Sequence, residues 1–492
     1  MTSLKQDVEK LIQTMLDHNP KADVDLVRLA YEFAEHAHEG QKRMSGEPYI
    51  VHPLAAAQFL ADMGAHAHIV AAALLHDVPE DTGVTLKDIE KEFGKDITSM
   101  VRGITKLGTL KYRGVERYIE NLRKMFVAMA QDVRVILIKF ADRLHNLQTL
   151  DSLPPKKRYR IALESLEIFA PIANRLGMGE IKGLLEDYSF KYVYPKEYEW
   201  VKHTRDQKTQ VREEYFNQVI KKVQYELKKA GIEVENIHWR KKNLYSMYEK
   251  IQRNENDINR VYDIIALRIV VHHIADCYAV LGILHKLWKP LKGRIKDYIA
   301  QPKPNGYQSL HTTVFCMDGE IVEFQIRTVE MHETAEYGIA AHWNYDEKTS
   351  TILPVKELAW VKELAKMQKD IMKRVQDLEL LKVDFFKNRI FVFTPKGDVI
   401  DLPEDASPVD FAYCIHTDIG NMCSGAKVNE RIVSLDTPLK NGDVVEILID
   451  KNRKGPSPDW ISFVKTNQAR SRIKQNTKQR LLSLNKLFGS FT

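Results

Sequence analysis

Residues 133–147 read VRVILIKFADRLHNL, and this segment decides how the first part of the chain folds. Its apolar residues lie almost all round a helix, a pattern typical of a helix in the middle of a bundle. Residues 68–78, HIVAAALLHDV, have the same property. A polar group inside such a helix needs a partner, because burying an unpaired carboxylate is costly. We therefore predict an all-α domain with Asp142 and His76 at its centre.

Helical periodicity extends over residues 1–195, with apolar residues at Val27, Ala30, Tyr31 and Ala34. The sequence pattern then changes. A charged amphipathic helix is predicted over residues 204–230, and runs rich in β-branched residues follow it. Residues 264–271 are predicted to form a strand, and residues 311–316 and 320–327 flank Met317-Asp318-Gly319, which indicates a β-hairpin. Residues 196–350 are therefore predicted to form a mixed α/β domain.

The remaining chain is predicted to contain a helical linker and a small strand-rich module. The linker covers residues 351–387 and the module residues 388–450, where turn signals separate short apolar runs. Residues 451–492 hold ten basic residues and one acid, Asp459, so this tail carries a net charge of +9. The whole chain carries +6, so the residues before the tail carry a net charge of −3. Such a tail suits RNA or another polyanion, a solvated helical face, or the start of a further domain.

Composition excludes several classes of protein. A chain of 492 residues has room for about three domains. Its 44% hydrophobic and 28% charged residues are ordinary for folded domains. No apolar stretch approaches the roughly 20 residues that cross a bilayer, and the N-terminus lacks the features of a signal peptide. Four cysteines without CxxC pairing fit a reducing compartment. We predict a cytoplasmic protein.

The helical domain contains a candidate metal site. His52, His76-Asp77 and Asp142 would bring imidazole and carboxylate groups together inside a bundle. A divalent cation satisfies several such groups at once, and mixed His/Asp ligands suit Mn, Fe or Zn. Glu80-Asp81 follow directly, where carboxylates could position or deprotonate a water bound to the metal. The alternative is a structural, buried His-Asp pair.

The α/β domain contains a candidate nucleotide site. On strand 320–327 the two-residue period places Glu323, Gln325 and Arg327 with Ile321 on one face and Val322, Phe324 and Ile326 on the other. Glu323 and Asp263, at the head of a neighbouring strand, could hold Mg²⁺ on a nucleotide. Nearby in sequence are basic residues and an aromatic residue suited to nucleotide binding: Arg240, Lys241, Lys242, Lys250, Arg294, Lys296 and Tyr307. The alternative is a solvated basic surface with Tyr307 in the core.

Short motifs spread over the first two modules resemble those of the long RelA/SpoT homologues, the enzymes of the bacterial stringent response. They are His52, residues 76–81 (HDVPED), residues 141–146 (ADRLHN), residues 262–263 (YD) and residues 323–328 (EFQIRT). The resemblance covers essentially the whole chain, in the family's order. It implies a multidomain α+β protein with an all-α HD-type hydrolase domain, a nucleotidyltransferase-like synthetase domain and a β-grasp TGS module.

For the helical domain, the resemblance implies a hydrolase that removes pyrophosphate from the 3′ position of (p)ppGpp and returns GDP or GTP. The implied Mn²⁺ ligands are His52, His76, Asp77 and Asp142. The residues matched to activation of water are Glu80 and Asp81, and those matched to binding of the guanosine nucleotide are Arg43 and Asn146.

For the α/β domain, the resemblance implies transfer of the β,γ-pyrophosphate of ATP to the 3′-hydroxyl of GDP or GTP, leaving AMP. Asp263 matches a Mg²⁺ ligand, and Glu323 matches the residue that helps bind Mg²⁺ and deprotonates the hydroxyl. The positions matched to nucleotide binding are Arg240, Lys242, Ser246 and Lys250 for the ATP phosphates and Tyr307 for guanine stacking, with Asn305 and His311 beside it. Residues 294–297 (RIKD) resemble the basic motif of bifunctional members.

The third module resembles the TGS segment that contacts the CCA end of uncharged tRNA in ribosome-bound relatives. The matching residues are 412–420 (AYCIHTDIG), and His416 is the candidate contact; a structural role is the alternative. Full-length relatives continue into further regulatory parts, so the resemblance implies that residues 451–492 begin a helical regulatory region that is cut short.

Three functions are therefore distinguished. The first is a bifunctional (p)ppGpp synthetase/hydrolase with intact residues at both sites. The second is an HD phosphohydrolase whose α/β domain is a degenerate nucleotide sensor, and formation of AMP only with GDP or GTP present would exclude it. The third is a regulator that only binds the ribosome and tRNA. Because the two reactions oppose each other, coupling through residues 154–230 is expected, with reciprocal effects on binding.

Overall fold

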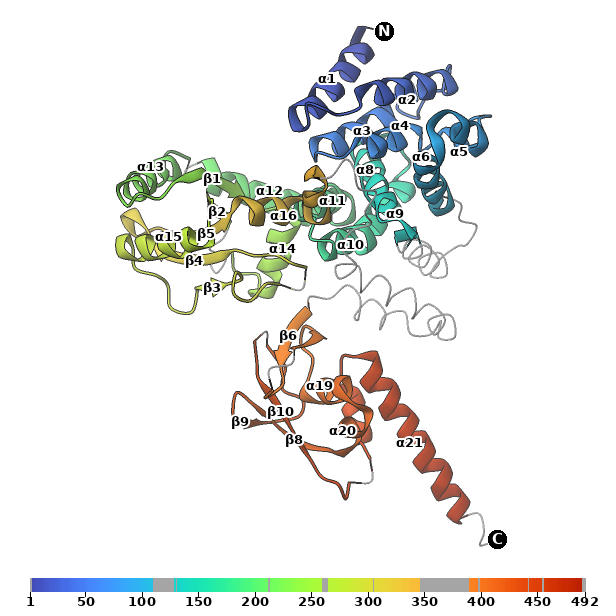
Figure 1. Ribbon diagram of the computed structural model, residues 1–492. Coiled ribbons are helices and arrows are strands. Elements are labelled where there is room, and N and C mark those ends of the chain that lie inside the picture. Colours follow the sequence, from blue (N-terminus) through green and yellow to red (C-terminus); the bar gives the residue numbers. More distant parts are fainter. Residues whose placement is uncertain are drawn as a thin grey trace. The chain divides into compact units, whose positions relative to one another are not determined.

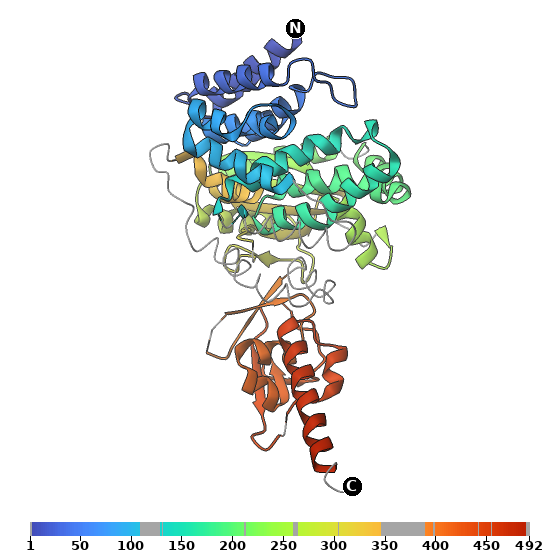
Figure 2. The same cartoon turned by 90° about the vertical axis from the view of Figure 1, so that its right-hand side faces the viewer.

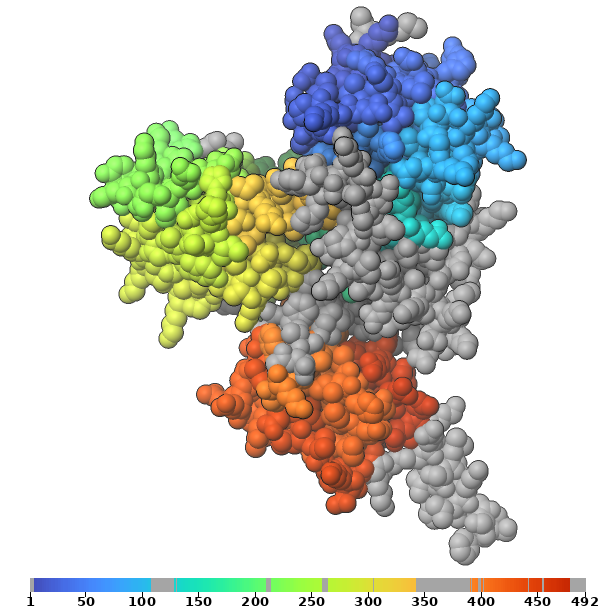
Figure 3. All heavy atoms as spheres, in the orientation of Figure 1, coloured from blue at the N-terminus to red at the C-terminus, as the bar shows by residue number. Residues whose placement is uncertain are grey.

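The structure is a computed structural model that divides into two compact units, Met1–Gln368 and Lys369–Thr492. It describes residues 2–108, 128–129, 131–210, 213–258, 264–303, 305–345, 389–396, 399–440, 442–453 and 455–488. Figure 3 draws the rest of the chain in grey. In the described ranges, no helix is both long and apolar enough for a membrane span.

The first unit begins with a helical bundle, which can be followed in Figures 1 and 2. Its elements are α1 (Thr2–His18), α2 (Val24–Ala37), α3 (Val51–Asp62), α4 (Ala67–Leu75), α5 (Val78–Asp81), α6 (Leu86–Gly108), α8 (Arg134–Gln148), η1 (Leu150–Ser152), α9 (Pro155–Glu164), η2 (Ser165–Phe169), α10 (Ala170–Arg175) and α11 (Gly179–Val193). Helix α4 is buried at every residue except His68 and packs against α2, α3, α6 and α8. The prediction of a helical domain with two central apolar helices is confirmed.

The end of α4 shows how the sequence places polar groups inside the bundle. The helix predicted over residues 68–78 ends at Leu75, and the short helix α5 begins at Val78 with Pro79 in its first turn. Proline has no N–H to continue the helical hydrogen bonds of the preceding turn. His76 and Asp77 therefore lie at the junction between the two helices, beside the buried face of α8.

The bundle is followed by a domain with a five-stranded sheet. Its elements are α12 (Pro195–Gln210), α13 (Glu213–Lys229), β1 (Val234–Lys241), α14 (Leu244–Arg253), β2 (Ile265–Val271), α15 (Ile274–Leu287), β3 (Lys296–Asp297), β4 (Leu310–Phe315), η4 (Met317–Gly319), β5 (Ile321–Thr328), α16 (Val329–Tyr337) and η5 (Gly338–Tyr345). The strand order is β1-β2-β5-β4-β3; β2 and β5 are parallel and the other neighbours antiparallel. The predicted hairpin of β4 and β5 is confirmed. The helix predicted over residues 204–230 falls on two helices, α12 and α13.

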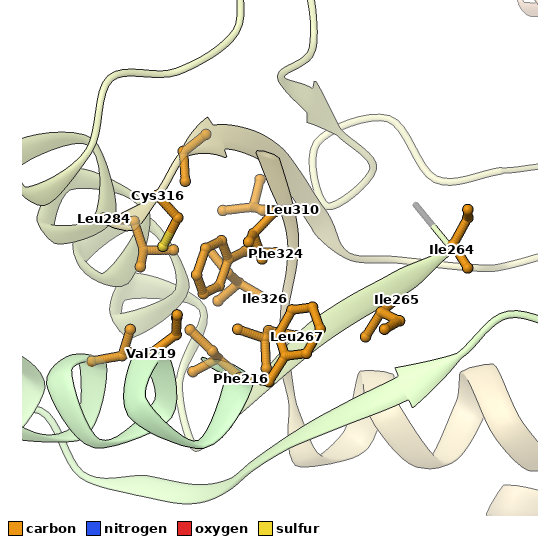
Figure 4. Close-up of a cluster of buried hydrophobic side chains, with 14 of the residues drawn as sticks. Phe216, Val219, Ile264, Ile265, Leu267, Leu284, Leu310, Cys316, Phe324 and Ile326 are labelled. Carbon is orange, nitrogen blue, oxygen red and sulfur yellow. The ribbon is translucent and has the colours of Figure 1, made fainter. Parts of the chain in front are cut away.

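The two faces of β5 have different surroundings. Val322, Phe324 and Ile326 are buried in a hydrophobic cluster. Figure 4 shows Phe324 and Ile326 beside Leu284 of α15 and Phe216 of α13. The opposite face carries Glu323, Gln325 and Arg327, as the two-residue period predicts. Arg327 has no exposed surface at all, so this face is covered at one end.

The bundle and the sheet domain meet where glycines let backbones approach. Gly338 has φ +57°, and a Cβ atom there would lie 2.2 Å from the carbonyl oxygen of Leu176. A Cβ atom on Gly179 would lie 2.5 Å from the carbonyl oxygen of Ala335. The backbone N–H of Ile339 donates to the Leu176 carbonyl at 3.2 Å. Only residues without a side chain fit this contact between α10–α11 and α16–η5.

We expect Gly338→Ala to destabilise the first unit by about 2 kcal/mol or more, because it adds backbone strain and a clash with the Leu176 carbonyl. Thermal unfolding of the full chain measures the loss. Gly282→Ala is the matched control: Gly282 lies in α15, its added Cβ would meet nothing within 4 Å, and alanine there should stabilise by about 0.5–1 kcal/mol. Equal unfolding temperatures for the two variants would show that the contact is not tight.

The second unit is rich in short strands. Its elements are β6 (Arg389–Phe393), β7 (Val399–Pro403), α19 (Pro408–Ile415), α20 (Thr417–Met422), β8 (Cys423–Val428), β9 (Arg431–Val433), β10 (Val445–Ile449), η7 (Pro458–Ser462) and α21 (Asn467–Phe488). Strands β6 and β7 form an antiparallel pair, and β10-β8-β9 form a three-stranded sheet. The strand-rich fold predicted for this module is confirmed.

Helix α19 organises the second unit. Asp410 is fully buried and accepts hydrogen bonds from Ser407, from the backbone N–H of Lys465 and from both the N–H and the hydroxyl of Thr466. Behind it, Val409 and Ala412 share a hydrophobic cluster with Trp460, Val464 and Ile473. The first turns of the basic segment are thus part of this unit's core.

Candidate active sites

Three elements of the bundle bring the predicted metal ligands together. His52 lies on α3, His76 follows α4, and Asp142 lies on α8; one ligand atom of each lies within 4.8 Å of the others, and all three residues are buried. Asp77 completes the group, with carboxylate oxygens 3.1 Å from His76 Nε2 and 3.6 Å from His52 Nε2. All four predicted ligands therefore converge, although they are far apart in sequence.

Hydrogen bonds fix which ring nitrogen of each histidine faces the cluster. His76 Nδ1 lies 2.7 Å from the Ala73 carbonyl, which can only accept, so Nδ1 carries the proton. His76 Nε2 is then left facing the cluster, buried and without a hydrogen-bond partner among the described residues. A buried imidazole nitrogen beside two carboxylates is the donor set that a divalent cation satisfies.

The charge of the cluster also fits a cation. Burial raises the pKa of the Asp142 carboxyl, but Lys139 and His52 outweigh it and hold that pKa well below its usual range. Burial opposes protonation of His76, yet the Asp77 and Asp142 carboxylates raise its pKa to about 9. Two ionised carboxylates thus attract positive charge to one point. A divalent cation meets that demand, and it would displace the His76 proton.

A second layer of polar residues orients the ligands. His145 Nδ1 lies 2.8 Å from His52 Nδ1 and 2.9 Å from Arg43 Nη1. Burial, His52 and Arg43 lower the pKa of His145 to about 3, so it is neutral and accepts. His52 therefore donates from Nδ1 and turns Nε2 toward Asp142, 3.1 Å away.

The other predicted residues of this site lie around the cluster. Arg43 donates to Asn146 at 2.8 Å, and Asn146 donates to Asp142, so both predicted nucleotide contacts adjoin the ligands. Glu80 and Asp81 lie on α5 and are exposed. The prediction missed Lys139, whose Nζ lies 2.6 Å from Asp142, and Tyr49, whose hydroxyl lies 3.0 Å from Asp77 and 2.5 Å from Asp81. Lys139 could have been found in the sequence, because a lysine within an otherwise apolar helix needs a partner of opposite charge.

We expect the purified protein to retain about one divalent cation after dialysis against Mn²⁺, and His76→Ala to lose most of it, because the substitution removes a buried ligand. Metal analysis of the dialysed protein measures the content. His68→Ala is the matched control, since His68 is an exposed histidine on α4 whose Nδ1 pairs with Asp96. Equal metal content in the two variants would contradict a cation at this cluster.

The polar face of the sheet brings a second group together. His311, on β4, lies opposite Gln325 of β5, and its Nδ1 is 3.2 Å from Glu323 Oε1. Gln325 donates to the same carboxylate oxygen at 3.1 Å, and the Tyr307 hydroxyl lies 2.8 Å from His311 Nε2. Burial lowers the pKa of His311, so the neutral ring can accept from Tyr307 while its Nδ1–H donates to Glu323. Four predicted residues thus form one hydrogen-bonded group.

The loop that carries Tyr307 is held from the helical bundle. Asn305 donates to the Asn174 carbonyl of α10 at 3.1 Å, and the Tyr307 N–H donates to the Asn305 side chain at 3.3 Å. The Lys303 ammonium lies 4.7 Å from the ring centroids of both Tyr298 and Tyr307. Lys296 is paired with His311 across β3 and β4. Asp263 lies outside the described residues.

All of the remaining predicted residues except Arg294 lie near α14 and β1. Arg240 donates to Asn243 at 3.2 Å and pairs with Glu336 at 3.4 Å, and Ser246, in α14, donates to Glu186 at 3.2 Å. Lys242 follows β1 and Lys250 lies in α14, while Arg294 lies in the loop before β3.

A group of charged residues that the sequence analysis missed lies next to Arg240. Glu336, on α16, is shared by Arg268 at 2.9 Å and Arg327 at 3.5 Å as well as by Arg240. No side-chain nitrogen of Arg327 has a hydrogen-bond partner in the described structure, and all are buried. An arginine within the apolar run of β2 was the signal that could have located this group.

The sequence matches three domain families in the order that the fold suggests. Residues 30–179 match the HD domain, residues 239–350 match the region found in RelA/SpoT proteins, and residues 390–449 match the TGS domain. A guanosine-3′,5′-bis(diphosphate) 3′-pyrophosphohydrolase of Aquifex aeolicus is 49% identical over 479 residues, covering 97% of this chain and 67% of the relative. The chain belongs to the RelA/SpoT family.

Other RelA/SpoT relatives are nearly as similar. A GTP pyrophosphokinase of Myxococcus xanthus is 45% identical, covering 97% of this chain and 64% of the relative. The bifunctional (p)ppGpp synthase/hydrolase SpoT of Escherichia coli is 45% identical, covering 96% of this chain and 67% of the relative. The chain thus spans about two thirds of the length of these RelA/SpoT proteins.

Proposed function

We propose that this chain is a bifunctional enzyme of alarmone metabolism, which makes (p)ppGpp at one site and hydrolyses it at the other. The observation that carries the proposal is the presence of two separate groups of predicted site residues in one RelA/SpoT chain. One is the buried His52–His76–Asp142 cluster, and the other is the hydrogen-bonded group around Glu323. Relatives are named for each of the two reactions and for both together.

In the synthetase reaction, the 3′-hydroxyl oxygen of GDP or GTP attacks the β-phosphorus of ATP, and the bond to the AMP oxygen breaks. Glu323 takes the hydroxyl proton, and His311 and Gln325 hold its carboxylate in place for that step. Tyr307 would stack on guanine. The positive charges that offset the phosphates are assigned to Arg240, Lys242, Lys250, Arg294 and Lys296, with Ser246 and Asn305 as polar contacts. Asp263 and Glu323 would hold Mg²⁺, which neutralises part of the triphosphate charge.

In the hydrolase reaction, water adds to the phosphorus that is bonded to the ribose 3′-oxygen. The bond between that phosphorus and the 3′-oxygen breaks, and the 3′-oxygen takes up a proton, which gives GDP or GTP and pyrophosphate. His52, His76, Asp77 and Asp142 would hold Mn²⁺, which supplies a Lewis acid when bound. Glu80 and Asp81, which lie on α5, would take the proton of the water. Arg43 and Asn146 bind the guanosine nucleotide from the side of α8.

The third module supports a role in sensing. We assign recognition of uncharged tRNA on the ribosome to the TGS domain. His416 lies between α19 and α20, with a side chain that is 64% exposed and an Nδ1 that accepts from the Asp418 N–H. The accessible ring edge is free to contact a nucleotide. We place the protein in the cytoplasm, where these substrates and partners occur.

Single substitutions should separate the two activities. Asp77→Ala is expected to abolish hydrolysis of (p)ppGpp and to spare formation of AMP from ATP and GDP, since it removes only a ligand of the bundle. Glu323→Gln is expected to reduce AMP formation by about 10²-fold or more and to spare hydrolysis, because the amide cannot take the hydroxyl proton. Timed nucleotide chromatography with ATP, GDP, Mg²⁺ and Mn²⁺ measures both.

The outcomes discriminate among the functions. AMP that forms only when GDP or GTP is present excludes the phosphohydrolase with a degenerate synthetase domain. Loss of both activities in either folded variant would contradict two independent sites. A wild-type chain that neither forms AMP nor hydrolyses supplied (p)ppGpp would leave only the binding function.

A further inference from the structure

The first turn of α14 is held by a helix of the other domain. The free N–H groups at a helix start usually bond to the side chain of the N-cap residue. Asn243, the N-cap residue of α14, makes no such bond. Instead, the carboxylate of Asp187, on α11, accepts from the N–H of Leu244 at 3.1 Å and from the N–H of Tyr245 at 3.0 Å.

The neighbouring residue on α11 extends this contact. Glu186 is buried, and its carboxylate accepts from the Ser246 hydroxyl at 3.2 Å and pairs with Lys182 at 2.8 Å. Phe190, one turn further on, packs against the rings of Tyr245 at 5.4 Å and Tyr248 at 5.1 Å between centroids. The start of α14 is therefore fixed by polar contacts and the next turn by aromatic packing.

The same helix also positions Arg240. A Cβ atom on Gly183 would lie 1.9 Å from Asn243 Nδ2, so the Asn243 side chain rests directly on α11. Asn243 Oδ1 then accepts from Arg240 Nη2 at 3.2 Å. Arg240 and Ser246, both assigned to the ATP phosphates, are thus held in their places through residues of α11.

The Asp187 carboxylate also determines what α14 can bind. The N-terminus of a helix attracts anions because its N–H groups are free and its dipole is positive there. In this chain a carboxylate already uses the N–H groups of Leu244 and Tyr245. A phosphate of ATP cannot take the same two donors, so side chains near this helix must contribute to holding the triphosphate.

We propose that Asp187 is a positioning residue of the synthetase: from α11 it fixes the first turn of α14 and thereby places the side chains that bind the phosphates of ATP. This inference is based on the synthetase activity proposed above. It concerns ATP alone, because the guanosine-binding residues lie on β4, β5 and the loop before them. It assigns no role to Asp187 in hydrolysis.

The test compares three variants of the full chain in steady-state assays of AMP formation. Asp187→Ala should raise the KM for ATP about tenfold, the size of a lost helix cap, while the KM for GDP and the rate of (p)ppGpp hydrolysis change less than about twofold. Asp187→Asn, whose amide oxygen still accepts from an N–H, should restore most of the affinity. Lys191→Ala is the matched control, since Lys191 lies on α11 but pairs with exposed Asp151.

A binding measurement separates this inference from the activity on which it is based. Equilibrium dialysis measures the dissociation constant of a non-hydrolysable ATP analogue. This constant should be raised in Asp187→Ala, largely restored in Asp187→Asn and unchanged in Lys191→Ala. Gly183→Ala provides a second perturbation, because it displaces the Asn243 side chain but keeps the Asp187 carboxylate. It should also weaken binding of the analogue. An unchanged KM and dissociation constant for ATP in folded Asp187→Ala, or equal losses for ATP and GDP, would overturn the proposal. A wild-type chain that binds the analogue but forms no AMP would refute the synthetase activity instead.

Discussion

Helix α11 is buried on two sides, and this double burial is the constraint from which the arrangement of the first unit follows. It packs against α8, which carries Asp142, and against α14 and α16 of the sheet domain. Glycines at 179 and 183 let its backbone approach its neighbours, and the Asp187 carboxylate replaces the side-chain cap that α14 lacks. A helix with apolar, small and acidic residues on its buried faces cannot move relative to one domain without disturbing the other.

Sequence patterns identified the site residues because each is a polar residue in a segment whose pattern predicts burial, and a buried polar group needs a partner. Asp142 and His76 were recognisable as polar groups in helices that are apolar all round, and Glu323 by the alternation of β5. Their convergence could be inferred only from the need to pair buried charge. Contacts such as Tyr49 with Asp77 or Asp187 with Tyr245 join residues of different elements, and no period in the sequence records that geometry.

The sequence also overestimated the continuity of helices. The pattern over residues 68–78 is apolar throughout, so it predicts a single helix, but Pro79 requires the chain to start a new turn. The missed group of Arg268, Arg327 and Glu336 has a different cause. Arg268 interrupts the apolar run of β2 and Arg327 lies on the polar face of β5. Only the parallel pairing of β2 with β5 brings both arginines onto the same face of the sheet, within reach of Glu336 on α16.

The two sites bury unbalanced charge of opposite sign, and each imbalance predicts the charge of its ligand. In the bundle, Asp77 and Asp142 face one half-buried lysine among the described residues, Lys139, together with histidines that are neutral when they act as ligands. At the sheet, Glu336 is shared by Arg240, Arg268 and Arg327. Unpaired charge in a protein interior costs several kcal/mol, so a fold retains it only where a ligand of opposite charge offsets the cost. A divalent cation suits the first site and a polyphosphate the second, and a pyrophosphate-transfer enzyme that also hydrolyses its product needs both.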